Sequence, residues 1–261
     1  MDNTLAAAKA IAAARRNRAP LQSLGPEIAP RDEAEGYRIQ RAVHDLLLPY
    51  VGAMVGYKIG CTSAVMQRYL DIPHPCGGGV FAKGVHDSGA ALRASDFVRV
   101  GVECEIAVRL GHDLPPSQAP FTADAAAHAI EAYLPAIEIV DDRYVQWETM
   151  GAPTLVADDF FAAGCVLGSP VARTKAPDLL EVIGRAVING NEVSRGTGAD
   201  VLGHPHNALA WLANHLAAHD KGLLAGQIVL TGSLVKTVWL EAGDKVVMEL
   251  KGLGTVEAAF A

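Results

Sequence analysis

The chain has 261 residues, of which half are hydrophobic and one fifth are charged, and its formal net charge is -7 at pH 7. This balance excludes a disordered or fibrous protein, and the length is sufficient for one large domain. The short basic cluster at residues 15–18 is better explained as the end of a helix than as a nucleic-acid footprint. We therefore expect no nucleic-acid partner.

The four cysteines show no CxxC spacing, and a chain of this size does not need disulfides to fold. The alanine-rich start lacks the basic region of a signal peptide. No apolar stretch reaches the roughly 18 residues that a membrane span requires. These features predict a cytoplasmic protein that makes no contact with a membrane.

Two helices are predicted to open the chain. A run rich in Ala, Leu and Lys with an Arg-rich end predicts a helix over residues 3–18, and a second helix should start after Pro30 and end at Pro49. After Gly52 short β-prone runs separated by Gly and Pro predict strands at 54–59, 79–81, 97–110, 136–140, 163–167, 186–188, 227–230, 235–240 and 245–250. Helical patterns interrupt these runs at 122–133, 177–182 and 205–220.

The order of these elements predicts an α+β protein with a large, mostly antiparallel sheet system. No internal repeat at a fixed period and no Pro- or Ser-rich linker divides the chain. We therefore expect a single compact unit, with a helical N-terminal cap over residues 1–52 and a β-rich catalytic domain over residues 53–261.

Three glutamates in apolar surroundings suggest a cation site. Glu103 and Glu105 flank Cys104 in a β-prone run, and positions i and i+2 of a strand point to the same face. Two carboxylates this close raise each other's pKa when the surroundings are core-like, and a bound cation relieves that cost. Glu138 lies inside the apolar run 134–140, where an isolated charge needs a similar explanation.

Ligation by oxygen alone favours a hard cation such as Mg²⁺ or Mn²⁺, because Zn²⁺ sites usually recruit His or Cys. Three protein ligands would leave three positions of an octahedral cation open for water or substrate. The alternative is that Glu103 and Glu105 mark a solvent-facing strand edge and that Glu138 pairs with an Arg. Spacing alone leaves both interpretations open.

Five motifs in the same order make the chain resemble a known family, the 2-oxopent-4-enoate hydratases and 4-oxalocrotonate decarboxylases of the fumarylacetoacetate hydrolase superfamily. The resemblance spans nearly the whole chain. The motifs are residues 55–63, the strand that carries Glu103 and Glu105, residues 136–143, residues 198–205 followed by 207–214, and residues 226–232.

The resemblance implies a mixed β-roll or barrel-like core with N-terminal helices, a homo-oligomer, and Mg²⁺ or Mn²⁺ on Glu103, Glu105 and Glu138. It also implies a hydro-lyase that adds water to a 2-hydroxydienoate or 2-oxo-enoate of aromatic catabolism and gives a 4-hydroxy-2-oxo acid. A small 2-oxo acid fits the metal prediction, because its two oxygens can chelate the open coordination positions.

The resemblance also assigns roles to residues around the glutamates. Lys58 occupies the family's active-site lysine position, where it would hold the substrate carboxylate or shuttle a proton; the alternative is a surface lysine at a strand edge. Thr231 falls where the superfamily places a hydroxyl against the substrate; the alternative is a plain turn residue. Cys76, Phe81 and Phe161 complete the predicted substrate-binding residues.

Two positions depart from the family pattern. Cys76 stands where the known hydratases carry an acidic residue of the proton-transfer apparatus, and a thiol with a pKa of ~8.5 does not replace a carboxylate without retuning. Phe160 and Phe161 lie where a Ser-containing stretch is expected, and they predict a more apolar wall. Near these positions, Arg143 is expected to neutralise a neighbouring aspartate, Asp141 or Asp142.

The sequence leaves more than one function open. Hydration is the leading hypothesis, and metal-dependent decarboxylation of a 2-oxo-dienedioate is the first alternative because it uses the same enolate chemistry. Hydrolysis of a C–C bond is less favoured without a clear His–Glu pair to activate water. The loss of the acidic residue at Cys76 motivates a different class, a non-catalytic partner subunit in a complex with a related decarboxylase or hydratase.

Overall fold

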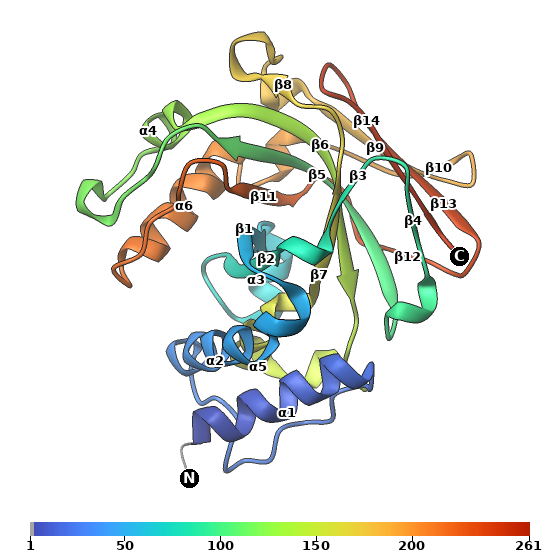
Figure 1. The fold of residues 1–261 in the computed structure, drawn as a ribbon. Coiled ribbons are helices and arrows are strands. Elements are labelled where there is room, and N and C mark those ends of the chain that lie inside the picture. The colour runs from blue at the N-terminus through green and yellow to red at the C-terminus, as the bar shows by residue number, and fades with distance from the viewer. Residues whose placement is uncertain (1–2) are drawn as a thin grey trace.

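The structure is a computed structural model that describes residues 3–261. Figure 1 shows its two sheets and the helices around them. The α-helices are α1 (Asn3–Asn17), α2 (Glu33–Val51), α3 (Ala64–Leu70), α4 (Ala123–His128), α5 (Gly151–Ala157) and α6 (Pro205–Ala217). The strands are β1 (Met54–Gly60), β2 (Cys76–Phe81), β3 (Val85–Asp87), β4 (Ala90–Leu92), β5 (Val100–Leu110), β6 (Ile130–Asp141), β7 (Ala162–Leu167), β8 (Val171–Ala172), β9 (Ile183–Ile188), β10 (Asn191–Thr197), β11 (Ile228–Ser233), β12 (Val238–Trp239), β13 (Asp244–Leu250) and β14 (Gly254–Phe260).

The larger sheet has nine strands and curves around the centre of the molecule (Figure 1). Its main order is β2-β1-β11-β5-β6-β7-β3, with β12 beside β5 and β8 beside β6. Its longest strands, β5 and β6, form an antiparallel pair in which Val100 lies opposite Asp141. The curvature turns side chains of β1, β5 and β6 towards one another, although β11 lies between β1 and β5.

The smaller sheet has five strands in the order β10-β9-β13-β14-β4, and it packs against the larger one. Apolar side chains such as Ile106, Val246 and Phe260 fill the core between the sheets, and α6 packs against β11 and α4. Among the described residues the parallel pairs are β1 with β11, β3 with β7 and β4 with β14. The predicted α+β, mostly antiparallel architecture is confirmed, and neither sheet closes into a barrel.

The N-terminal helices form a second layer with its own hydrophobic cluster, in the lower part of Figure 1. The Asp32 side chain caps α2 by accepting a hydrogen bond from a backbone N–H of the first turn. The helix then buries Val43 and Leu47, while α1 buries Ala8 and Ile11 against the same cluster. Helix α5 and the buried end of β2 join this layer. The division at residues 52 and 53 stays a prediction.

Two predicted helix ends are wrong. Helix α2 continues through Pro49 to Val51, because a proline in the last turn removes only one hydrogen bond and the Gly52 N–H still bonds to the Leu48 carbonyl. The helix predicted over 122–133 ends at His128. Residues from Ile130 onward instead extend β6, because pairing with β5 overrides the local helical pattern.

Several other elements differ from the predictions. Residues 177–182 form only a 3₁₀ turn, Leu179–Glu181, rather than a helix. The strand predicted over 235–240 shortens to β12. Helices α3 and α5 and strands β3, β4, β8, β10 and β14 were not predicted, because they are short or lack a clear apolar period.

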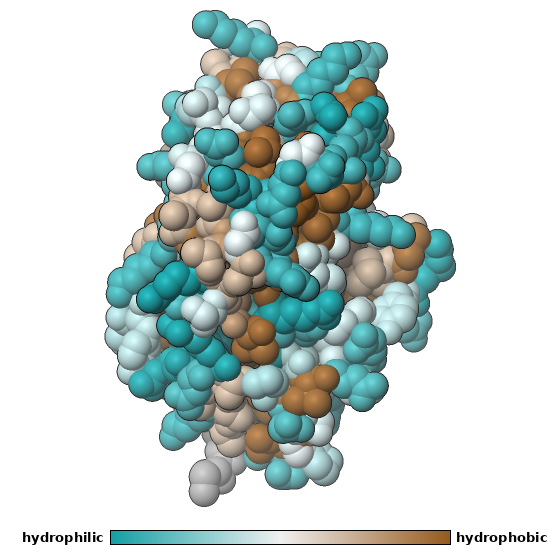
Figure 2. Space-filling model, turned by 90° about the vertical axis from the view of Figure 1, so that its right-hand side faces the viewer, coloured by the Kyte–Doolittle hydropathy of each residue, from teal (hydrophilic) through white to brown (hydrophobic). Residues whose placement is uncertain are grey.

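The face shown in Figure 2 is mostly hydrophilic, and hydrophobic residues gather there in small patches between hydrophilic ones. Over residues 3–261 no helix combines the length and the apolar composition that a membrane crossing requires. All four cysteines are buried free thiols.

Candidate metal centre and substrate cavity

Three buried or partly buried glutamates meet on the concave face of the larger sheet. The register of β5 with β6 places Glu103 directly opposite Glu138, and Glu105 follows two residues along the same face of β5. One carboxylate oxygen from each of the three lies within 4.8 Å of the others. Glu105 and Glu138 are fully buried, whereas Glu103 is partly exposed.

Lys58 approaches the cluster from β1. Its Nζ lies 2.9 Å from Glu138 Oε1, and both side chains are almost completely buried. Burial opposes the charge on Lys58, but attraction to Glu138, Glu103 and Glu105 outweighs it, so the pKa of Lys58 is raised and the ammonium form is favoured. The Nζ also lies 5.5 Å from the centre of the Phe160 ring.

The carboxylates themselves are destabilised as anions. Burial and the neighbouring Glu138 raise the pKa of Glu103 to about 7, against the opposing effects of Lys58 and the Thr237 hydroxyl. Burial, together with the charges of Glu138 and Glu103, raises the pKa of Glu105 well above its usual value. The hydrogen bond from the Gly232 N–H to Glu105 Oε2, at 2.9 Å, offsets only part of this cost.

The cluster fits a divalent cation. Three carboxylates face one ammonium group, so two negative charges remain when all three are ionised. Glu105 Oε1 and Glu138 Oε2 are buried and have no hydrogen-bond partner among the described residues. A buried carboxylate oxygen without a partner is costly, and a hard cation coordinated by oxygen removes that cost.

A cavity of about 180 Å³ opens onto the cluster through Lys58 and Glu138. Its remaining wall combines apolar side chains and glycine backbone with two further cations. The lining residues besides Lys58 and Glu138 are Arg15, Tyr50, Val51, Gly79, Val80, Phe81, Lys83, Gly84, Ala162, Ala163, Gly164 and Leu230.

The structure brings only some of the predicted substrate-binding residues to this cavity. Phe81 lines it. Cys76 is completely buried, and burial raises the pKa of its thiol. Thr231 is also buried, and its hydroxyl donates to the Ile106 carbonyl at 2.7 Å. Phe161 packs against other aromatic rings. The roles assigned to Cys76, Phe161 and Thr231 stay predictions.

The Asp-Asp-Phe-Phe stretch at 158–161 forms a sharply turned segment beside the cavity. Asp159, Phe160 and Phe161 all have positive φ, at 57°, 48° and 69°. Each such non-glycine residue costs about 1–3 kcal/mol and persists only where its surroundings hold it. The turn places the Phe160 ring near Lys58, so Phe160 rather than Phe161 supplies the apolar wall next to the lysine.

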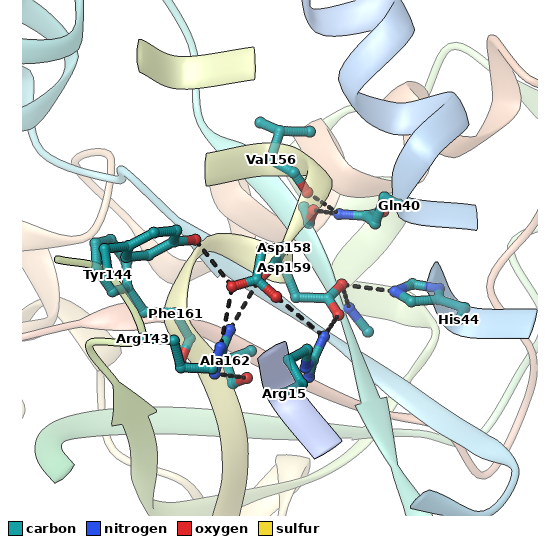
Figure 3. Close-up of polar contacts among 12 residues, drawn as sticks. Arg15, Gln40, His44, Arg143, Tyr144, Val156, Asp158, Asp159, Phe161 and Ala162 are labelled. Atoms are coloured by element: carbon teal, nitrogen blue, oxygen red, sulfur yellow. Dashed lines mark hydrogen bonds and ion pairs between the residues drawn. The ribbon is translucent and has the colours of Figure 1, made fainter. Parts of the chain in front are cut away.

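A polar network holds this segment in place (Figure 3). Arg143 Nε donates to Asp158 Oδ2 at 3.0 Å, and the Tyr144 hydroxyl donates to the same oxygen. Arg143 therefore forms its ion pair with Asp158 rather than with Asp141 or Asp142, although its charge also acts on Asp141 and opposes the effect of burial on the pKa of that carboxyl. Asp141 accepts hydrogen bonds from two backbone N–H groups just before β5, and Asp142 lies beside an exposed arginine.

Asp159 connects the N-terminal helices to the cavity wall (Figure 3). Arg15 Nη1 of α1 lies 2.9 Å from Asp159 Oδ2, and His44 Nε2 of α2 lies 2.7 Å from Oδ1, which also accepts from the Gly79 N–H. Burial disfavours the carboxylate, but His44, Arg15 and the Gly79 N–H together lower the pKa of Asp159. No local sequence pattern indicates these partners, because they lie far from Asp159 along the chain.

Fold and site together define a class of protein in which a curved mixed sheet carries a cluster of carboxylates that could hold a cation. The Fumarylacetoacetate (FAA) hydrolase C-terminal profile matches residues 79–261. A 2-keto-4-pentenoate hydratase from Burkholderia vietnamiensis is 36% identical over 248 residues, which cover 92% of this chain and 93% of the relative. A 2-hydroxyhexa-2,4-dienoate hydratase from Comamonas testosteroni is 34% identical, covering 94% and 91%.

Among solved structures, a 4-oxalocrotonate decarboxylase from Pseudomonas putida G7, complexed with magnesium and adipate, superimposes with a TM-score of 0.93. It is 26% identical in sequence, and the match covers 99% of this chain and 97% of that one. The chain therefore belongs to the fumarylacetoacetate hydrolase family, in the branch that contains these hydratases and the decarboxylase. The predicted family and the predicted hydro-lyase class are confirmed.

Proposed function

We propose that the chain is a metal-dependent hydratase that adds water to a 2-hydroxydienoate, by way of its 2-oxo-enoate form, and releases a 4-hydroxy-2-oxo acid. The observation that carries this proposal is the buried cluster of Glu103, Glu105 and Glu138, which has unpartnered oxygens and opens to a cavity beside Lys58. The relatives named as hydratases support the choice of reaction.

The glutamates would hold Mg²⁺ or Mn²⁺, and the bound cation would polarise the 2-oxo group as a Lewis acid. Lys58 would hold the substrate carboxylate or pass a proton at Nζ, since the neighbouring carboxylates favour its ammonium form. The Phe160 ring would keep water away from one side of this ammonium group. Water would then add across the C3–C4 double bond of the 2-oxo-enoate, with the hydroxyl group at C4 and the hydrogen at C3.

Decarboxylation of a 2-oxo-dienedioate is the second candidate. The close superposition on a 4-oxalocrotonate decarboxylase favours it, because the two chains match over almost their whole length. Both reactions need the same glutamates and differ in the bond that changes. A homo-oligomer, a cytoplasmic location and a role in aromatic catabolism belong to the same proposal.

One assay tests these functions together. The protein would be supplied with Mg²⁺ or Mn²⁺ and either 2-hydroxypenta-2,4-dienoate or oxalocrotonate. The loss of ultraviolet absorbance by the substrate and the release of CO₂ would then be followed. We expect ultraviolet loss without CO₂ from the dienoate, and a loss of at least about 1000-fold in Glu105→Ala, since a metal ligand and a preorganised charge are removed together. No turnover of either compound by metal-loaded wild type would overturn both candidates and favour a non-catalytic partner subunit.

A further inference from the structure

The two fully buried glutamates of the cluster are each held through one oxygen by a protein donor. Lys58 Nζ lies 2.9 Å from Glu138 Oε1, and the Gly232 N–H donates to Glu105 Oε2 at 2.9 Å. The opposite oxygens, Glu105 Oε1 and Glu138 Oε2, are buried and have no hydrogen-bond partner among the described residues. Each of these two glutamates is therefore left with one oxygen for a cation.

Glu103 has the same arrangement, although it is partly exposed. Its Oε1 accepts a hydrogen bond from the Thr237 hydroxyl, and its Oε2 has neither a hydrogen bond nor an ion pair with another described residue. A donor on one carboxylate oxygen orients the group and opposes binding of a cation through both oxygens. Thr237 thus does for Glu103 what Lys58 and Gly232 do for the other two glutamates.

The register of β12 with β5 explains why Thr237 reaches Glu103. Trp239 lies opposite Gly101 in this antiparallel pair, so Thr237, two residues earlier, comes opposite Glu103, two residues later. Residue 101 shares a face with Glu103. A Cβ at Gly101 would lie 3.0 Å from Thr237 Cγ2 and 2.7 Å from Trp239 Cε3. Glycine at this position therefore leaves the space that Thr237 needs.

The segment that carries Thr237 is fixed on both sides. Before it, the Leu234 N–H donates to the Cys104 carbonyl of β5 at 2.9 Å. After it, the Arg99 guanidinium carbon lies 4.3 Å from the centre of the Trp239 ring. A hydroxyl on a fixed backbone orients its carboxylate before a cation arrives, as hydrogen-bond partners of ligands do at metal sites.

Monodentate ligation by each glutamate suits some cations better than others. Mg²⁺ requires near-octahedral geometry, and Mn²⁺ also favours octahedral oxygen sites. Ca²⁺ takes about 6–8 oxygen ligands and accepts both oxygens of a carboxylate. Three monodentate glutamates fill half of an octahedron, whereas a glutamate that is free to offer both oxygens would favour Ca²⁺.

We propose that Thr237 is a positioning residue that holds Glu103 as a monodentate ligand, and that it thereby makes the glutamate cluster favour Mg²⁺ or Mn²⁺ over Ca²⁺. This inference rests on the cation site of the proposed function. Thr237 acts on the cation only through Glu103 and takes no part in the bond changes of the substrate.

The test separates the hydroxyl of Thr237 from its methyl group. Isothermal calorimetry on the full chain measures the Kd of Mn²⁺ and the Kd of Ca²⁺ in wild type, Thr237→Val and Thr237→Ser. We expect the ratio of the Ca²⁺ Kd to the Mn²⁺ Kd to fall about 10-fold in Thr237→Val, because Glu103 loses its donor and is free to offer both oxygens. Thr237→Ser keeps the hydroxyl and should keep the wild-type ratio.

Thr255→Val is the matched control, because Thr255 is an exposed threonine of β14 outside the cluster, and it should also keep the wild-type ratio. Thermal unfolding in EDTA checks that each variant folds. Thr237→Ala removes the same hydroxyl at this partly exposed position and should give the same fall if the valine variant does not fold.

A wild-type ratio in a folded variant that lacks the hydroxyl would overturn the role of Thr237, and so would an equal fall in Thr237→Ser. Both outcomes would leave the proposed function standing, since wild type still binds Mn²⁺ in these experiments. Wild-type protein that binds neither cation would overturn the cation site itself, and the proposed function with it.

Discussion

The molecule contains two buried groups of carboxylates whose charges are balanced in different ways. In the Asp158–Asp159 network, Arg143, Arg15 and His44 supply partners for both acids (Figure 3). In the glutamate cluster, Lys58 is the one cation among the described residues that pairs with the three carboxylates, and Glu105 Oε1 and Glu138 Oε2 have neither a hydrogen-bond nor an ion-pair partner there. Asp158 Oδ1 also lacks a hydrogen bond, but it lies 3.5 Å from Arg15 Nη1. Burial of an acid therefore does not by itself indicate a metal site.

The two groups also differ in the direction of their pKa shifts. Donors around Asp159 lower its pKa, so the folded protein favours the charged carboxylate. In the glutamate cluster burial and mutual repulsion raise the pKa of Glu103 and Glu105. Buried carboxylates whose charge is matched by neighbouring donors stabilise the fold, whereas buried carboxylates with unmatched negative charge are suited to bind a cation.

The largest expected effect comes from removing one carboxylate of the Asp158–Asp159 network. Asp158→Asn should lower the free energy of unfolding by about 3–5 kcal/mol, because it leaves the buried Arg143 guanidinium without its anionic partner. Mn²⁺ affinity should stay at the wild-type value. Urea unfolding followed by circular dichroism measures the first quantity, and calorimetry measures the second.

The matched control for Asp158→Asn is Glu131→Gln, which removes an exposed carboxylate that pairs with Arg109. Its cost should lie between about 0 and 1 kcal/mol, as for other surface pairs. A loss below about 1 kcal/mol in Asp158→Asn, or a parallel loss of Mn²⁺ affinity, would show that the two groups are not separate.

The second prediction concerns the glutamate cluster. Mg²⁺ or Mn²⁺ at 100 times its Kd should stabilise the metal-free protein by about 2.7 kcal/mol, because the ion binds only the folded state. This gain should vanish in Glu105→Gln and persist in Glu257→Gln, whose exposed carboxylate lies outside the cluster. Thermal unfolding with MnCl₂ and with EDTA measures the gain. An undiminished gain in Glu105→Gln would remove the cluster as the metal site.

The contrast between the groups also explains what the sequence was able to predict. The i, i+2 spacing was sufficient for Glu103 and Glu105, since a strand places both on one face. The position of Glu138 opposite Glu103 depends on the register of β5 with β6, which the spacing did not provide. The resemblance to the family supplied the shared site, together with the role of Lys58, whereas local composition was sufficient to predict the two N-terminal helices.

The Asp158–Asp159 network could not be predicted from the sequence. Its partners are far apart in sequence, since 144 positions separate Arg15 from Asp159. Its turn also uses positive φ at Asp159, Phe160 and Phe161, a conformation that aromatic residues rarely adopt and that no local pattern indicates. Arg15 was not among the predicted site residues for a similar reason. Its position at the cavity depends on how α1 packs against the rest of the fold.

The smallest expected effect is a pH dependence of stability in the metal-free protein. The pKa of Glu103 is about 7 in the fold and near 4.3 in an unfolded chain, so between these values the folded state binds more protons. Stability should therefore fall as pH rises from 5.5 to 8, by about 1–2 kcal/mol after allowance for partial exposure. The lowered pKa of Asp159 acts in the opposite sense, because its contribution is present above about pH 4 and is lost in acid. Urea unfolding in EDTA at both pH values measures the fall, which should flatten in Glu103→Gln. A fall of unchanged size in that variant would mean that a group other than Glu103 carries it, and Glu105, whose pKa is also raised, would be the first to examine.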